Sequence, residues 1–425
     1  MPRTSLIILL SLTLAACQSP SGSSAQNGAD NAATGTEQAA GTNTDIPEKP
    51  SFPEWRDALR EEALAAGVSA ETFDSAFASV RVNPEIIAKD RDQSEFTKPV
   101  WSYLDSAVSP ERVANGRLMQ TQHRAQLDSA AKQYGVPDKI ILAIWGLESA
   151  YGANTGGYNV IESLATLAYD GRRPDVFREQ LIDALLILEA GDIDPLSMRG
   201  SWAGAMGQTQ FMPSAFKKYA VDGDNDGRRD IWGDTADVFD STANYLVGYG
   251  WTPGEAWGAE VKLPRDFPWE QAEIDIKKPV MEWRKLGVAL ANGGELPATS
   301  SMASVIAPAG HRGPAFIVFD NFHTILRYNY SSAYALAVGH LSDRIAGGPP
   351  LVATWPRDDV PLTKDERVEL QELLAGMGYD PGGVDGVVGP KTRTALRQYQ
   401  RSIGQVPDGY PTSQLLQQLK ESAPS

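Results

Sequence analysis

Residues 137–150 read PDKIILAIWGLESA, and this largely apolar stretch is the starting point for interpreting the fold. Ile141, Trp145 and Glu148 follow one another at spacings of four and three residues, which predicts a helix with Glu148 on or beside its apolar face. Desolvation raises the pKa of a carboxyl group, so a glutamate in that position stays protonated near neutral pH and can act as a general acid. The spacing alone leaves open a solvent-facing glutamate at the end of a helix that stops before Gly152.

Helical periodicity extends to both sides of this stretch. From Phe52 onward, large apolar residues recur mostly every three to four positions, which indicates that amphipathic helices begin there, and a further helical pattern covers residues 177–190. Two shorter runs, Glu260–Leu263 and Phe316–Phe319, have the composition of β-strands. The sequence therefore predicts an α+β fold that is mainly α.

The composition is that of a folded, acidic protein. The chain has 425 residues, enough for two or three domains, and 42% of them are hydrophobic, which excludes disorder of the whole molecule. Asp and Glu number 54 against 38 Lys and Arg, so the net charge is −16. Because this charge repels DNA and RNA, we expect no nucleic-acid partner.

The first residues have the pattern of an export signal. Arg3 precedes an apolar run that is too short to span a bilayer. The run ends in LAAC at residues 14–17, which resembles a bacterial lipobox and implies a lipoprotein signal over residues 1–17, with lipid attached at Cys17. Gln18, by the same resemblance, favours an anchor in the outer membrane that faces the periplasm. The alternative is an ordinary signal peptide with a chance cysteine.

Two segments of low apolar content divide the rest of the chain. Residues 18–50 are rich in Ser, Gly, Ala, Asn and Thr and are expected to form a flexible tether. Residues 347–361 contain clustered Gly and Pro and are expected to be a linker. They leave a large domain at residues 51–346 and a small one at residues 362–420. The small domain is expected to hold three helices, at residues 368–377, 392–403 and 412–419.

The small domain carries a set of short motifs. These are LQELL at 370–374, GY at 378–379, VDG at 384–386, GPKT at 389–392 and ALRQYQ at 395–400. Together they closely resemble the peptidoglycan-binding domain-1 family, and the resemblance implies binding of cell-wall peptidoglycan. The loop glycines permit positive φ and Asp385 can brace the loop, so a structural role is favoured over ligand contact for each single residue.

The large domain carries longer motifs. These are AIWGLESAYG at 143–152, SLATLA at 163–168, GRR at 171–173 and GSWAGAMGQTQFMPS at 200–214. They look like the membrane-bound lytic transglycosylase B family over about Phe52 to Ile345, and the catalytic acid of that family maps onto Glu148. The resemblance implies a lysozyme-like core, with accessory helical and small β parts, that cleaves the MurNAc–GlcNAc β-1,4 bond without water and leaves 1,6-anhydromuramoyl ends.

The resemblance also implies a mechanism with one carboxyl group. Most two-carboxylate glycosidases place a second Asp or Glu about 5 to 9.5 Å from the acid, and no second carboxylate of this chain has a motif assignment. In the family's mechanism Glu148 protonates the glycosidic oxygen, and the substrate's N-acetyl oxygen shields the anomeric carbon. Glu148 then takes the proton of the C6 hydroxyl, which closes the anhydro ring. No cofactor is expected for catalysis.

Further residues are implied to contact the saccharide. Ser201 would hydrogen-bond near the catalytic carboxyl or the N-acetyl group, and Gln210 would bind sugar polar groups. The motif RYNYSSAY at 327–334 matches the family's Tyr-Asn motif, and aromatic faces suit sugar C–H surfaces. Both polar residues could instead support the fold, and the aromatic residues could be core. The candidate substrate-binding residues are Ser201, Gln210, Tyr245, Tyr328, Asn329 and Tyr334.

Residues 222–230, DGDNDGRRD, have the spacing of an EF-hand loop, with oxygen ligands at positions 1, 3, 5 and 9 and the turn glycine at position 6. Position 12 is Gly233 instead of Glu, so Asp234 or Asp237 must close the loop, and resemblance to the family favours Asp237. The alternative is an Asp/Gly-rich turn without metal. The candidate ligands of a structural Ca²⁺ are Asp222, Asp224, Asp226, Arg228 and Asp237.

Two rival functions remain at this point. A hydrolytic muramidase would use water where the transglycosylase uses the C6 hydroxyl, and a non-catalytic wall-binding lipoprotein would not cleave at all. Intact Glu148, Ser201 and Gln210 favour the enzyme. The expected partners are peptidoglycan strands and, through the anchor, a membrane. The sequence leaves open a role for cell-wall synthesis or division proteins.

Overall fold

The computed structural model describes residues 49–91 and 99–422. The predicted lipoprotein signal, Cys17 and nearly all of the predicted tether lie outside the described residues. Within the described part, no helix combines the length and the apolar character needed to pass through a bilayer.

Helix α7 (Asp138–Ser149) is the predicted central helix, and its residues from Ile140 to Gly146 are all buried. Pro137 precedes its first turn, and Ala150 follows it in the left-handed conformation that ends a helix. Four helices pack around α7: α5 (Pro110–Gln122), α6 (Arg124–Tyr134), α11 (Thr235–Gly248) and α14 (Ser332–Ile345). This bundle contributes many fully buried residues to the main hydrophobic core.

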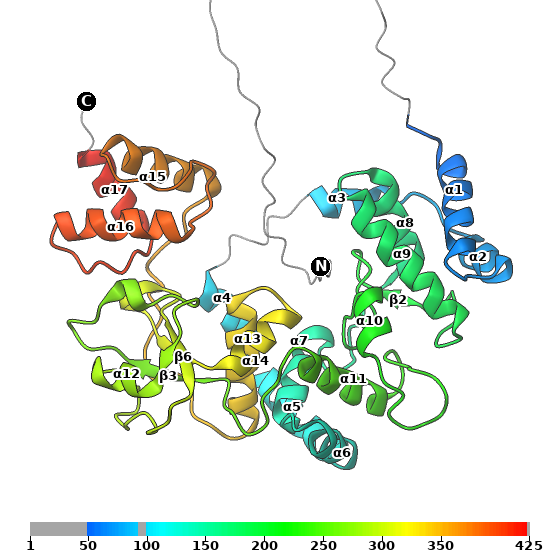
Figure 1. The fold of residues 1–425 in the computed structure, drawn as a ribbon, viewed down its shortest axis with the longest axis horizontal. Coiled ribbons are helices and arrows are strands. Elements are labelled where there is room, and N and C mark those ends of the chain that lie inside the picture. Colours follow the sequence, from blue (N-terminus) through cyan, green and yellow to red (C-terminus); the bar gives the residue numbers. More distant parts are fainter. Residues whose placement is uncertain (1–48, 92–98, 423–425) are drawn as a thin grey trace, which may run out of the picture.

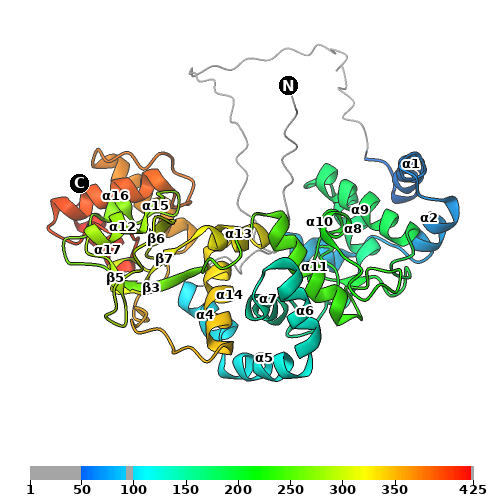
Figure 2. The same ribbon diagram turned by 60° about the horizontal axis from the view of Figure 1, so that its bottom comes forward.

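The remaining helices extend the body to both sides of the bundle (Figure 1). Their bounds are α1 (Phe52–Ala65), α2 (Ala70–Phe77), α3 (Pro84–Arg91), α4 (Val100–Ala107), α8 (Val160–Asp170), α9 (Pro174–Glu189), α10 (Pro213–Tyr219), α12 (Val280–Lys285) and α13 (Asp320–Tyr328), with 3₁₀ turns η2 (Trp269–Gln271) and η3 (Gly310–Arg312). In Figure 2 the body has the shape of a U, with α1, α2, α8 and α9 in one limb and the bundle at the bottom of the U.

An antiparallel sheet builds the other limb. Its strands are ordered β4-β6-β7-β3-β5, and a separate two-stranded ladder pairs β1 with β2. The strand bounds are β1 (Tyr158–Asn159), β2 (Arg199–Gly200), β3 (Gly258–Lys262), β4 (Lys278–Pro279), β5 (Ala289–Leu290), β6 (Met302–Ile306) and β7 (Ala315–Val318). The two predicted strands are therefore confirmed as β3 and β7, within two residues at each end. A second hydrophobic core, centred on the fully buried Trp283, lies under the sheet.

The C-terminal segment is a separate helical unit with its own core. Its helices are α15 (Lys364–Gly376), α16 (Pro390–Ser402) and α17 (Ser413–Ser422), so all three predicted helices are present. Leu370, Leu396 and Leu416 form part of a third buried cluster. The α+β class, mainly α, with a small C-terminal helical module, is confirmed.

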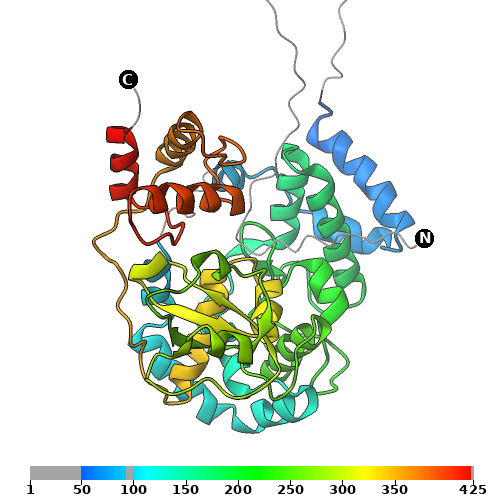
Figure 3. The same cartoon turned by 60° about the vertical axis from the view of Figure 1, so that its left-hand side comes forward.

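The module is docked on the sheet limb instead of hanging from a free linker (Figure 3). Glu273 of the body accepts hydrogen bonds from Arg393 at 2.8 Å and from Arg397 at 2.6 Å. Burial raises the pKa of Glu273, but the two arginines outweigh it and hold the pKa below its ordinary value. Within the linker, the backbone N–H groups of Val352 and Ala353 donate to Glu260 on β3. The linker and the module are thus both fixed to the body.

Candidate active site

Glu148 lies in the last turn of α7, where the chain makes a sharp reversal. Ala150 has φ of 50° and Tyr151 has φ of 61°, both in the left-handed region that non-glycine residues rarely adopt. The Tyr151 N–H donates to Trp145 O, and the Tyr151 hydroxyl donates to Arg112 O on α5 at 2.8 Å. These contacts hold the strained turn and fix the end of the helix that carries Glu148.

The pKa of Glu148 is raised to about 7. Burial is the larger cause, and a hydrogen bond from the Tyr334 hydroxyl to Oε1, 2.6 Å long, acts in the opposite direction. No carboxylate among the described residues contributes to the shift. Glu148 therefore meets the sequence-based expectation of a desolvated carboxyl that exchanges a proton near neutral pH.

Three tyrosines surround this carboxyl, from three different helices. Tyr103 on α4, Tyr328 at the end of α13 and Tyr334 at the start of α14 all have pKa values raised by burial and, next, by the negative charge of Glu148. The rings of Tyr328 and Tyr334 are stacked, and the Tyr328 hydroxyl donates to Thr209 O at 2.7 Å. Sequence analysis missed Tyr103, whose only signal is a tyrosine within a short apolar helix.

The motif at residues 200–214 folds into a tight loop beside α8 and α11. Gly204 and Gly207 have φ of 89° and 61°. A Cβ on Gly204 would lie 2.4 Å from the Leu164 side chain, and one on Gly207 would lie 2.6 Å from Ile231 O, so only glycine fits either position. These two glycines therefore have a structural role.

Ser201 and Gln210 both make the fold-supporting contacts that sequence analysis left open. Ser201 Oγ accepts the N–H groups of Ala203 and Ala205, and Gln210 Nε2 donates to Thr155 O and Gly207 O. No described residue accepts the Ser201 hydroxyl proton or donates to Gln210 Oε1, which leaves one polar function on each side chain for a ligand. Gln210 is also strained, with φ of 52°.

Gln208, which sequence analysis did not single out, ties this loop to the catalytic helix. Its Oε1 accepts a hydrogen bond from Trp145 Nε1 on α7, and its Nε2 donates to Trp232 O, each at 2.8 Å. The side chain is 7% exposed, so both of its polar ends are satisfied in the interior. Its signal in the sequence is only its place directly after Gly207.

Tyr245, predicted as a substrate-binding residue, makes its contacts in the core. It is 1% exposed, packs on Phe211 and Tyr328, and its hydroxyl donates to Arg327 O at 2.8 Å. The geometry fits a positioning role for the end of α13 instead. Asn329, directly after that helix, is partly exposed and has an extended backbone.

The acidic loop brings together three of the predicted metal ligands. One carboxylate oxygen each from Asp222, Asp224 and Asp237 lies within 4.8 Å of the others. Burial, followed in part by the charges of Asp234 and Asp224, raises the pKa of Asp237 to about 6, although two backbone N–H groups oppose the shift. Three converging carboxylates that repel one another are a donor set that fits a hard cation such as Ca²⁺.

The other candidates at this loop have different contacts. The Asp226 carboxylate accepts the Arg228 backbone N–H and pairs with the Arg228 guanidinium, so it does not join the cluster of three. Asp234 caps helix α11 by accepting the N–H groups of Ala236 and Asp237. Of the two residues proposed to close the loop, Asp237 is the one that faces Asp222 and Asp224.

Two family models match the chain. The model for the transglycosylase SLT domain covers residues 51–343, and a model for a peptidoglycan binding domain covers residues 363–419. The membrane-bound lytic murein transglycosylase B of Escherichia coli strain K12 is 34% identical over 250 residues, which span 57% of this chain and 66% of that relative.

Solved structures of similar proteins extend this comparison. The chain resembles SltB3 of Pseudomonas aeruginosa in complex with NAG-anhNAM-pentapeptide, with a TM-score of 0.84, 52% identity, and coverage of 87% of this chain and 99% of that chain. It also resembles the Escherichia coli lytic transglycosylase Slt35 in complex with calcium, with a TM-score of 0.61, 29% identity, and coverage of 71% and 94%.

Because the pKa of Glu148 is raised, replacing this residue with a neutral one should increase the free energy of unfolding at high pH. The folded-state pKa of about 7 lies above the ordinary 4.5. The contribution of Glu148 to the free energy of unfolding is therefore fully present below pH 4.5 and is lost as the pH rises through 7. Glu148→Gln avoids that loss. It should raise the free energy of unfolding by roughly 3 kcal/mol at pH 8 and change it little at pH 4.

Urea unfolding at the two pH values measures this difference. The matched control is Glu162→Gln, which keeps a side-chain acceptor for Asn83 on the neighbouring element and should not show the same pH dependence. An equal effect of Glu148→Gln at both pH values would contradict the assigned desolvation.

Proposed function

The chain belongs to the transglycosylase SLT family and carries a C-terminal peptidoglycan binding domain, and on this premise we propose how its residues cleave peptidoglycan. As a lytic transglycosylase with a lysozyme-like body, it breaks the MurNAc–GlcNAc β-1,4 bond and leaves 1,6-anhydromuramoyl ends. The observation that carries the assignment of the catalytic group is the carboxyl of Glu148, whose pKa of about 7 suits it to donate and to accept a proton.

In the first step Glu148 acts as the acid. Its proton moves to the glycosidic oxygen while the bond from that oxygen to the anomeric carbon of MurNAc breaks. The N-acetyl oxygen of the substrate shields the electron-poor anomeric carbon. Tyr334 orients the carboxyl and stabilises the carboxylate that forms, because its hydroxyl donates to Oε1 at 2.6 Å.

In the second step the Glu148 carboxylate acts as the base. It takes the proton of the C6 hydroxyl, and the C6 oxygen bonds to the anomeric carbon, which closes the anhydro ring and restores the acid. No water is consumed. This route needs one carboxyl group, whereas a muramidase of the two-carboxylate kind would need a second one to activate water.

We assign the saccharide contacts to the polar functions that the fold leaves available. The Ser201 hydroxyl proton and Gln210 Oε1 face no described partner. Asn329 already has a contact within the fold, and it is included because it is partly exposed directly after Tyr328. Tyr334 touches Glu148, and Tyr328 supports it through ring stacking. Tyr103 joins this set, since Glu148 influences its hydroxyl. Alanine at Ser201 or Gln210 that left KM and kcat unchanged would remove that residue from the site.

The division of labour follows the two matched families. Residues 51–346 are the catalytic domain, residues 347–361 the linker and residues 362–420 the wall-binding domain, in agreement with the separate hydrophobic core of the module. The chain acts on the cell wall in the periplasm. Lipid on Cys17 holds the chain at the outer membrane. The membrane-bound name of the Escherichia coli relative supports an anchor.

A structural Ca²⁺ is the second proposal for this body. Asp222, Asp224 and Asp237 would hold the ion, which would neutralise their mutual repulsion and stabilise the loop between α10 and α11. The complex of Slt35 with calcium supports the choice of metal. The ion takes no part in the steps assigned to Glu148.

Glu148→Gln should abolish cleavage and preserve binding to the wall. Glutamine cannot donate or accept the proton, so the rate of release of soluble muropeptides should fall at least about 10³-fold. Mass spectrometry of the products from purified peptidoglycan reads both the rate and the chemistry. Wild-type products with anhydro ends are expected, and reducing ends, heavier by one water, would indicate a muramidase.

The same measurement separates the remaining outcomes. Glu162→Gln is the matched control and should release products at the wild-type rate. Native activity in the Glu148→Gln variant would remove Glu148 from the mechanism. Sedimentation with the wall without any wild-type product would favour a binding protein.

Cys17→Ala should abolish lipid attachment. Metabolic labelling with a radioactive fatty acid in a Gram-negative host should label the wild-type chain and not the variant, because the thioether needs the cysteine sulfur. A wild-type chain that is exported without label would identify an ordinary signal peptide.

Ca²⁺ should stabilise the chelator-treated protein against heat. A ligand at about 100 times its Kd adds about 2.7 kcal/mol to the free energy of unfolding, which raises Tm by several degrees. Asp237→Asn should lose most of this response, whereas Asp234→Asn, which keeps an oxygen to cap α11, should retain it. A wild-type Tm that ignores Ca²⁺ would rule out the site.

A further inference from the structure

The loop after α15 is braced by one buried glutamine. Gln371 is 1% exposed, its Oε1 accepts the N–H of Gly386 at 2.8 Å, and its Nε2 donates to Asp385 Oδ1 at 3.3 Å. The same Oδ1 accepts the N–H of Val387, two residues later, at 2.8 Å. Gly386 has φ of 75°, which glycine adopts without strain.

The loop after α16 repeats this arrangement. Gln400 Oε1 accepts the N–H of Gly409 at 2.8 Å, and its Nε2 donates to Asp408 Oδ1 at 2.8 Å. Asp408 Oδ1 also accepts the N–H of Tyr410, two residues later, at 2.9 Å, and Gly409 has φ of 73°. The module thus holds two equivalent loops, each with a braced aspartate whose second oxygen points outward.

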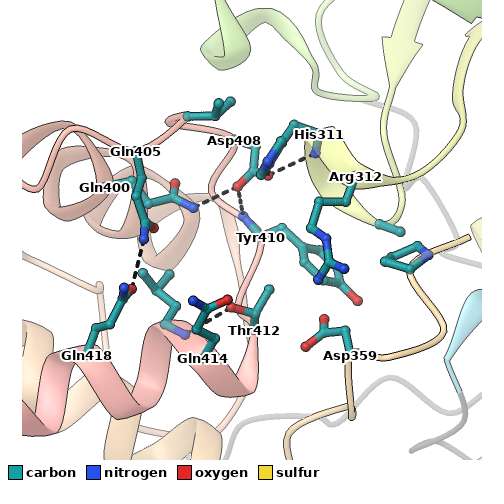
Figure 4. A pocket seen from close by; sticks show the side chains of 14 residues that line it. His311, Arg312, Asp359, Gln400, Gln405, Asp408, Tyr410, Thr412, Gln414 and Gln418 are labelled. Carbon is teal, nitrogen blue, oxygen red and sulfur yellow. Dashed lines mark hydrogen bonds and ion pairs between the residues drawn. The ribbon is translucent and has the colours of Figure 1, made fainter.

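In the second loop the outward oxygen is occupied by the body. Asp408 Oδ2 accepts the backbone N–H of His311 at 2.9 Å and lies 2.6 Å from His311 Nδ1, which donates because a carboxylate only accepts (Figure 4). A Cβ on Gly310 would lie 2.5 Å from that oxygen, so the η3 turn approaches it closely. The second loop therefore binds a peptide backbone N–H together with an adjacent nitrogen donor.

A pocket of about 240 Å³ adjoins this contact, lined by Tyr410 and Arg312 among others. Docking selects the second loop because Arg393 and Arg397, which bind Glu273, lie on the helix before it. The positions 29 residues earlier, on α15, are Lys364 and Val368, which lack that pair of guanidinium groups.

In the first loop the outward oxygen is open. No donor among the described residues reaches Asp385 Oδ2, and Asp385 is exposed. Two large apolar side chains flank it in solvent, Val384 at 46% and Val387 at 53% exposure. The first loop therefore presents a charged acceptor between two exposed apolar side chains. Because the equivalent second loop binds a backbone N–H through its aspartate, these three side chains form a candidate recognition surface.

We propose that Val384, Asp385 and Val387 form the module's contact with the peptide stems of peptidoglycan. Asp385 Oδ2 accepts a backbone N–H of the stem peptide, as Asp408 Oδ2 does from His311, and the two valines pack on its short side chains. The free ammonium groups of stem peptides complement the carboxylate. The proposal rests on the wall-binding role proposed for the module and names the ligand part and the residues.

The test uses the mature chain with Glu148→Gln, which stops cleavage during binding. Its affinity is measured by co-sedimentation with intact sacculi and with sacculi whose stem peptides an amidase has removed. Asp385→Asn keeps an oxygen for Val387 and Gln371 but turns an N–H₂ outward, so affinity for intact sacculi should fall about tenfold. On peptide-free sacculi the variant and its parent should bind equally.

Two further variants keep the test decisive. Val387→Ser changes only the side chain, since the brace uses the Val387 backbone, and should also weaken binding to intact sacculi. Asp380→Asn is the matched control, because Asp380 is an exposed carboxylate before the surface that accepts the Gly382 N–H and pairs with Lys391, and the variant should bind within twofold of the parent.

The outcomes separate the two levels of the proposal. Undiminished binding by Asp385→Asn and Val387→Ser overturns this surface while the wall-binding role stands. An equal loss on intact and peptide-free sacculi overturns the peptide as the ligand. A parent chain that does not sediment with intact sacculi at all overturns the wall-binding role itself.

Discussion

The opposition between burial and one hydrogen bond at Glu148 is the constraint on which the rest of this structure depends. Burial raises the pKa of the carboxyl, and the hydrogen bond from the Tyr334 hydroxyl opposes this rise, so that the pKa is about 7. A group that must give a proton and then take one back needs this intermediate value. The two residues are 186 positions apart, so the chain must place α7 and α14 side by side to create it.

The backbone around the site carries the cost of that placement. Ala150, Tyr151 and Gln210 all adopt left-handed conformations, and each costs about 1 kcal/mol or more relative to ordinary helix or strand geometry. Buried hydrogen bonds offset this cost, above all those of Gln208, which joins Trp145 on α7 to the loop near Trp232. The strained backbone lies where the carboxyl and the polar side chains must converge, and its conformation sets their directions.

The elements and site residues that could be predicted are those that leave a pattern in a short stretch of sequence. Periodicity located α7, β3, β7 and the three module helices. The spacing around Trp145 left open whether Glu148 faces solvent, and resemblance to the family singled it out. Sequence analysis missed Tyr103, because a residue brought in by packing of α4 leaves no local pattern. The sequence also gave no sign that the Tyr245 hydroxyl donates to Arg327 O in the core, because that partner lies 82 residues away along the chain. Strands of two residues, such as β4 and β5, are set by pairing with longer neighbours and carry almost no signal of their own.

The net charge of the molecule and the docking of the module together affect how the module can bind the wall. A net charge of −16 opposes long-range attraction to an anionic wall. The module's arginines could have supplied local attraction, but Arg393 and Arg397 are bound to Glu273 and Arg401 is bound to Glu270, so docking neutralises the basic face of α16. What the module still presents is short-range chemistry, a braced carboxylate and exposed valines. The proposed surface therefore acts only at short range, through hydrogen bonds, ion pairing and apolar packing, and the docking of the module fixes its place on the body.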